Sequence, residues 1–182
     1  MEPTVVESGR TLGAEIKGID LSSALSEDDR ALILDAWHRH LVVLFRDQRL
    51  ADEDLVRLAE EFGGAQVAGS RDYYVKGGYG TKSGRISDLP GITIVSNLDE
   101  SGKPVAKHVG TGSQALGGHT DNSYVETPPK GSILYGIQTP VDGGGDTSFC
   151  NQYEAYETLP DGLRERIAGL HVKHDTSRNT AG

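Results

Sequence analysis

Glycine is unusually frequent in this chain and is concentrated in its middle. The sequence holds 24 glycines in 182 residues, nearly twice the share of roughly 7% that is typical of proteins. Most of the excess lies between Gly63 and Gly145. Because glycine favours turns, we expect this stretch to be rich in turns and loops. Within it, the residues from Ala65 to Pro90 predict a long loop of the kind that often has a function.

Helix and strand patterns lie on both sides of the glycine-rich stretch, and two strand patterns lie within it. Alternating apolar and polar residues predict a short strand at the start of Ala14–Leu21. Ser26 stands before three acidic residues, as an N-cap does, and apolar residues then recur at helical spacing for about four turns. The other expected elements are a buried strand at Leu41–Phe45, a helix from Asp52 that ends at Gly63-Gly64, strands at Ile92–Val95 and Ser132–Ile137, and a helix at Pro160–Leu170.

Composition and charge narrow the class of protein. With 36% apolar residues, the chain can form a core, and its length fits a single domain over residues 1–182. The net charge of −9 repels nucleic-acid phosphates, and the longest apolar run, Leu41–Phe45, is far too short to span a membrane. Cys150 is the single cysteine, and the N-terminus has no apolar stretch. We therefore expect a cytoplasmic protein that binds neither nucleic acid nor membrane.

The most specific chemical motif is the pair His119 and Asp121. On a strand, residues i and i+2 point to the same face, so the imidazole and the carboxylate would project together. So placed, they can occupy two adjacent positions on one metal ion. These would be two of the three ligands in the 2-His-1-carboxylate triad of non-haem Fe(II) oxygenases. The competing interpretation is a surface histidine beside a turn aspartate, since this tripeptide is common by chance.

Several further blocks of sequence give this motif its context. They are Pro128-Pro129, Gly144-Gly145-Asp146-Thr147 and Tyr153–Pro160 after the motif, with Gly13–Leu21 and Val43–Gln48 before it. With these blocks in order, the chain resembles the TauD/TfdA family of Fe(II)- and 2-oxoglutarate-dependent dioxygenases, from about Gly13 to His174. The resemblance implies a mostly β or α+β fold: a double-stranded β-helix (jelly-roll) core flanked by helices. It also implies an oxidoreductase that uses O2 to hydroxylate a small organic molecule and releases succinate and CO2.

The resemblance also implies roles for individual residues. His119 and Asp121 match the first histidine and the carboxylate of the iron triad, and are the candidate catalytic residues. Thr147 matches a threonine whose hydroxyl contacts a carboxylate of 2-oxoglutarate, and Asn97 lies near a position that touches substrate in some relatives. The competing interpretations are local, because Thr147 could instead satisfy the glycine turn that it ends, and Asn97 could be an Asx-turn residue.

The resemblance is incomplete at the C-terminal end. The family's second iron-binding histidine and its 2-oxoglutarate-binding arginine lie well over a hundred residues beyond the first pair, whereas 61 residues follow Asp121 here. His171 and His174 are the nearest candidates, but they match a segment that carries no ligand in the family. We therefore expect the domain to lack its C-terminal portion, with the distal histidine and arginine beyond Gly182.

Two departures from the family bear on the substrate and the activity. Gly118 replaces the aromatic residue that many relatives carry before the motif, and no histidine lies between Phe62 and Pro90, which weakens taurine as the substrate. The alternatives to a dioxygenase are an inactive fragment or binding module of the same fold, and a metal-dependent hydrolase. A homo-oligomer is left open.

Overall fold

The computed structural model describes residues 2–67, 71, 75–76, 87–96, 103, 118–141, 143 and 145–174. The chain divides into two compact units. The first comprises Met1–Gly63 and Ser148–His171, and the second comprises Gly64–Thr147 and Val172–Gly182. Most of the loop predicted between Ala65 and Pro90 lies outside the described residues.

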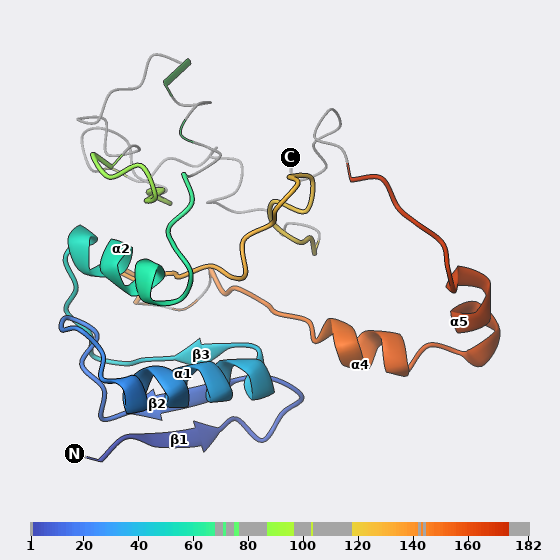
Figure 1. Ribbon diagram of the computed structural model, residues 1–182, viewed down its shortest axis with the longest axis horizontal. Helices are drawn as coiled ribbons and strands as arrows, with labels where there is room; N and C mark the ends of the chain where they lie inside the picture. The colour runs from blue at the N-terminus through green and yellow to red at the C-terminus, as the bar shows by residue number, and fades with distance from the viewer. Residues whose placement is uncertain are drawn as a thin grey trace. The chain divides into compact units, whose positions relative to one another are not determined.

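The first unit is built on a three-stranded sheet in the order β1-β2-β3 (Figure 1). Strand β1 (Thr4–Glu7) pairs antiparallel with β2 (Ala14–Lys17), so that Val5 lies opposite Ile16. Strand β2 then pairs in parallel with β3 (Val43–Leu44). Parallel strands need a crossover connection, and helix α1 provides it.

Helix α1 (Glu27–His40) begins as its sequence predicts. The Ser26 hydroxyl accepts a hydrogen bond from the Asp29 N–H at 3.0 Å. Three acidic residues in the first turn interact favourably with the positive end of the helix dipole. The helix ends at Leu41, whose φ of +65° is strained for a leucine. The Val42 N–H bonds the His40 carbonyl at 2.7 Å across this residue, which makes a tight three-residue turn into β3.

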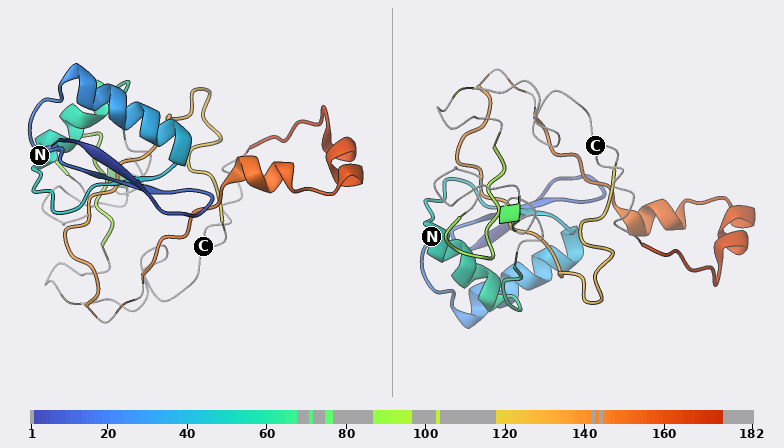
Figure 2. Two further views of the ribbon diagram at one scale, coloured as in Figure 1. Left: turned by 90° about the horizontal axis from the view of Figure 1, so that it is seen from below. Right: turned by 90° about the horizontal axis from the view of Figure 1, so that it is seen from above.

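The core of the first unit is formed by apolar side chains from α1, from α2 (Asp52–Glu61) and from β2 with the residues that follow it. Helix α1 runs along one face of the sheet (Figures 1 and 2). The buried cluster consists of Ile16, Ile19, Leu21, Ile33, Ala36 and Leu58. Burying each of the larger aliphatic side chains contributes about 1.5–3 kcal/mol, so this cluster is the main source of the unit's stability.

Two predicted strands differ from the structure. Leu41–Phe45 was expected to be a buried strand, but only Val43–Leu44 pairs, none of the five residues is buried, and Leu44 is 43% exposed. The reason is that β3 lies at an edge of this sheet and Leu41 is used to end α1. Ser132–Ile137 has no regular structure, and Leu134 and Ile137 are exposed. An apolar run becomes a strand only where a partner pairs with it.

Other elements differ in extent from the sequence prediction. The strand predicted at Ile92–Val95 is reduced to an isolated bridge at Thr93. Helix α5 (Asp161–Ile167) is shorter than the predicted Pro160–Leu170. Strand β1 and helix α4 (Gln152–Glu157) were not predicted. Among the described residues, every helix is too short or too polar to cross a membrane.

Candidate metal centre

His119 and Asp121 lie together in the second unit, but in a turn rather than on a strand. A turn begins at Asp121 and continues to Tyr124. His119 Nε2 lies 3.0 Å from Asp121 Oδ1. The i, i+2 spacing thus brings the imidazole and the carboxylate into contact, although the extended geometry from which this was argued is absent.

The turn after the pair is held by local hydrogen bonds. Asn122 has a φ of +51°, which an asparagine tolerates better than most residues. Its carbonyl accepts from the Val125 N–H at 3.2 Å, and its side-chain oxygen accepts from the Tyr124 hydroxyl at 3.3 Å. In the same unit, the Gln66 amide donates to the Thr127 carbonyl at 3.3 Å. These contacts set the direction in which the chain leaves Asp121.

Both side chains of the pair are accessible. His119 is 47% exposed and Asp121 is 69% exposed. Just before them, a Cβ added to Gly118 would meet no heavy atom of the described residues within 4 Å, so none of those residues fills the space beside this glycine.

The donor atoms of the pair suit an iron ion. Two donors bound at adjacent positions, each about 2.1 Å from one ion, would lie about 3 Å apart. His119 Nε2 and Asp121 Oδ1 already have that separation, and imidazole plus carboxylate is the donor set of non-haem iron sites. Within the described part of the chain, however, no third histidine, cysteine, aspartate or glutamate joins them.

The other candidate residues are either exposed or outside the described residues. Thr147 is exposed and lies in an irregular segment that follows Gly145, whose φ is +70°. Asn97 lies outside the described residues. His171 and His174 are both exposed, and neither completes a three-ligand cluster among the residues that the structure describes.

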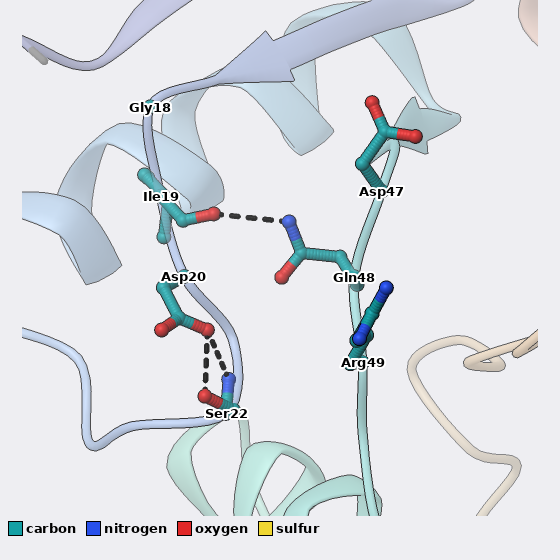
Figure 3. A pocket seen from close by; sticks show the side chains of 7 residues that line it. All are labelled: Gly18, Ile19, Asp20, Ser22, Asp47, Gln48 and Arg49. Carbon is teal, nitrogen blue, oxygen red and sulfur yellow. Dashed lines mark hydrogen bonds between the residues drawn. The ribbon is translucent and has the colours of Figure 1, made fainter.

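A shallow hollow in the first unit contains contacts that the sequence did not predict (Figure 3). Its wall is formed by Gly18, Ile19, Asp20, Ser22, Asp47, Gln48 and Arg49. The Gln48 amide donates to the Ile19 carbonyl at 3.1 Å, while its oxygen accepts from the Leu21 N–H at 2.9 Å. Hydrogen bonds from the Ser22 hydroxyl and N–H hold the pKa of the Asp20 carboxyl below its usual range.

Arg57 anchors the same loop from helix α2. Its guanidinium donates to the carbonyls of Leu21 and Ser23, both at 2.7 Å, and pairs with Asp54 and Glu61 on its own helix. The sequence offered one indication of this role, because Arg57 stands among the apolar residues of an amphipathic helix. These polar contacts stabilise the loop between β2 and α1 within the first unit.

Comparisons with known proteins agree on one family. The chain matches the model of the "Taurine catabolism dioxygenase TauD, TfdA family" over residues 4–181. It is 31% identical to pentalenolactone F synthase of Streptomyces avermitilis over 91% of this chain and 50% of that protein. It is 32% identical to an alkylsulfatase of Acinetobacter baylyi, over 94% of this chain and 46% of that protein.

Two further relatives support the same family. An alpha-ketoglutarate-dependent sulfate ester dioxygenase of Pseudomonas putida is 30% identical over 93% of this chain and 48% of its own length. A solved structure from Burkholderia xenovorans, assigned as an alpha-ketoglutarate-dependent taurine dioxygenase, superposes with a TM-score of 0.65 at 28% identity, over 92% of this chain and 53% of that one. The chain thus spans about half the length of the relatives it matches.

Proposed function

The chain belongs to the TauD/TfdA dioxygenase family, and on that premise we propose that it acts in a non-haem Fe(II)- and 2-oxoglutarate-dependent dioxygenase that hydroxylates a small organic molecule. The observation that carries this proposal is the His119–Asp121 pair, whose donor atoms lie 3.0 Å apart and are accessible. That donor set fits Fe(II), which with 2-oxoglutarate (alpha-ketoglutarate) and O2 supplies the oxidising power for hydroxylation, with succinate and CO2 released.

Each candidate residue has a specific role in this proposal. His119 and Asp121 hold the metal through Nε2 and a carboxylate oxygen, and Thr147 donates its hydroxyl proton to a carboxylate oxygen of 2-oxoglutarate. Asn97 contacts the substrate through its amide. The remaining histidine and the arginine that pairs with 2-oxoglutarate come from the polypeptide that corresponds to the second half of the relatives.

The same proposal includes the fold of the complete domain, the cellular location of the protein and its binding partners. Residues 1–182 form part of one dioxygenase domain whose complete core is a double-stranded β-helix, as the superposition at a TM-score of 0.65 supports. The protein acts in the cytoplasm on a small molecule and binds neither nucleic acid nor membrane. Its net charge of −9 and its single cysteine support this assignment.

Replacing Asp121 tests the metal centre directly. In the protein isolated from its native source, Asp121→Ala removes one of two placed ligands and should abolish both Fe(II) binding and consumption of 2-oxoglutarate. The matched control is Glu126→Ala, which removes an exposed carboxylate from the same segment and should leave both unchanged. Fe(II) binding is measured by titration and turnover by succinate release. Retained consumption of 2-oxoglutarate in Asp121→Ala would overturn the assignment.

Replacing Thr147 tests the co-substrate contact separately. Thr147→Val keeps the shape of the side chain but removes the hydroxyl donor, so the KM for 2-oxoglutarate should rise about tenfold, as expected for a lost hydrogen bond to a charged group. Thr147→Ser restores the donor and should restore most of the affinity. An unchanged KM in Thr147→Val would show that the hydroxyl only satisfies the glycine turn.

A further inference from the structure

The segment from Gly145 to Asn151 carries Thr147, the residue proposed to contact 2-oxoglutarate. The residues between its two ends are all exposed and belong to no helix or strand. At one end, Gly145 has a φ of +70°, a conformation that glycine adopts readily. At the other end, Asn151 is half-buried at the start of α4. The position of Thr147 therefore depends on how the ends of this segment are held.

Asn151 holds its end of the segment through both sides of its amide group. The side-chain oxygen accepts from the N–H groups of Tyr153 and Glu154, at 3.1 and 3.3 Å, and so caps α4. The side-chain nitrogen donates to the carbonyl of Thr11 at 2.8 Å. One residue thus joins the start of α4 to the turn between β1 and β2, 140 positions away in the chain.

The turn that receives this hydrogen bond is itself well held. The Ser8 hydroxyl donates to the Leu12 carbonyl at 2.7 Å, and the Ser8 N–H donates to the Gly13 carbonyl at 3.0 Å. The Gly13 N–H donates to the carbonyl of His40, at the end of α1, at 2.8 Å. Thr11 lies between these contacts, so its carbonyl is a fixed acceptor within the first unit.

We propose that Asn151 is a positioning residue for 2-oxoglutarate and acts through Thr147. Four residues of chain span at most about 14 Å, so the anchor at Asn151 limits where the Thr147 hydroxyl can lie. Without the hydrogen bond to Thr11, the exposed segment has more conformations, and binding of 2-oxoglutarate has to order it. This inference rests on the proposed function, in which Thr147 donates to a carboxylate of 2-oxoglutarate.

The substitution Asn151→Asp separates the anchor from the helix cap. An ionised aspartate still accepts from the N–H groups at the start of α4 but has no proton to donate to the Thr11 carbonyl. In the full protein isolated from its native source, the Kd for 2-oxoglutarate should rise about fivefold, which is the cost of ordering the freed segment on binding. The affinity for Fe(II) should stay the same, because His119 and Asp121 are unchanged. Equilibrium dialysis with Fe(II) and without O2 measures binding in the absence of turnover.

The matched control for the added negative charge is Gln152→Glu. Gln152 is exposed and is the first residue of α4, so this variant introduces the same charge one position away and keeps both contacts of Asn151. Its Kd for 2-oxoglutarate should equal that of the wild type. Far-UV circular dichroism of each variant verifies that the fold remains.

A double-mutant cycle with Thr147→Val tests whether Asn151 acts through the threonine hydroxyl. When that hydroxyl is absent, its position no longer matters. Adding Asn151→Asp to Thr147→Val should therefore raise the Kd for 2-oxoglutarate by less than about twofold, compared with about fivefold in the wild-type background. A purely structural role of Asn151 would give the same increase in both backgrounds.

Three results would overturn the proposal: an unchanged Kd in Asn151→Asp, an equal rise in Gln152→Glu, and an undiminished rise when Thr147 is already valine. Failure of the proposed function has a different signature. If Thr147→Val alone leaves the Kd unchanged, the contact between Thr147 and 2-oxoglutarate is refuted, and the role of Asn151 is refuted with it. If Thr147→Val raises the Kd and Asn151→Asp does not, the positioning role alone is refuted.

Discussion

Gln48 provides a direct test of how the first unit is held together. Its side chain accepts from the Leu21 N–H at 2.9 Å and donates to the carbonyls of Ile19 and Arg46, both at 3.1 Å. Leu21 is 4% exposed and Ile19 is 7% exposed, so water hardly reaches their backbone groups. In Gln48→Met, a side chain of similar size removes these three hydrogen bonds and leaves the Leu21 N–H and the Ile19 carbonyl without this partner.

The expected magnitude follows from burial. An unsatisfied buried backbone group costs about 1–3 kcal/mol, whereas the carbonyl of the exposed Arg46 regains a hydrogen bond from water. With two buried groups affected, and part of the loss offset by the apolar methionine, Gln48→Met should lower the free energy of unfolding by about 2–3 kcal/mol.

Urea unfolding followed by far-UV circular dichroism measures this change. Arg49→Met is the matched control because Arg49 lines the same hollow from an exposed position (Figure 3) and should change the free energy of unfolding by less than about 0.5 kcal/mol. If both variants unfold at the same urea concentration as the wild type, the hydrogen bonds of Gln48 contribute no net stability and the reasoning fails.

Two further substitutions test other polar contacts of the same unit. Asn151→Asp keeps the acceptor that caps α4 but loses the donor to Thr11, whereas Asn151→Ala loses both. In hydrogen exchange, the α4 amides should therefore keep their protection in Asn151→Asp and lose it in Asn151→Ala, a cap worth about 1 kcal/mol; equal loss in both would contradict this. The lowered pKa of Asp20 means that its ionised form stabilises the fold above the ordinary aspartate pKa, and that this contribution is lost as the pH falls through the lower folded value. As the pH is lowered, the melting temperature should therefore fall less steeply in Asp20→Asn than in the wild type. If the melting temperatures of the two proteins fall in parallel, ionised Asp20 does not stabilise the fold.

The elements that the sequence predicted well are those specified by nearby residues. Ser26 and the acids after it mark the start of α1, and the apolar spacing within the helix indicates which face is buried. Helix α2 (Asp52–Glu61) ends just before the predicted Gly63-Gly64 stop. A cap and a helical repeat depend on interactions within a few residues, so a single sequence contains nearly all of the information they need.

The strands were predicted less well because pairing depends on distant residues. Ser132–Ile137 and Leu41–Phe45 have similar apolar runs, yet neither run as a whole became a buried strand. Strand β1 was not predicted because Thr4–Glu7 is specified by its pairing with β2 rather than by its own pattern. Helix α4 did have a local signal, since Asn151 is an N-cap with an acid at Glu154, but its six residues were too few for a clear repeat.

In the candidate metal centre, too, the sequence predicts the contact between neighbouring residues but not the contribution of a distant one. His119 and Asp121 are separated by one residue, so bringing their donor atoms to 3.0 Å closes a very short loop and costs little chain entropy. A third ligand has to arrive from elsewhere in the domain, and no spacing rule within a short motif specifies where. It follows that the pair should be present whether or not the domain is complete, whereas tight binding of Fe(II) requires the third ligand. Fe(II) affinity is therefore a measure of domain completion that does not depend on knowing the substrate.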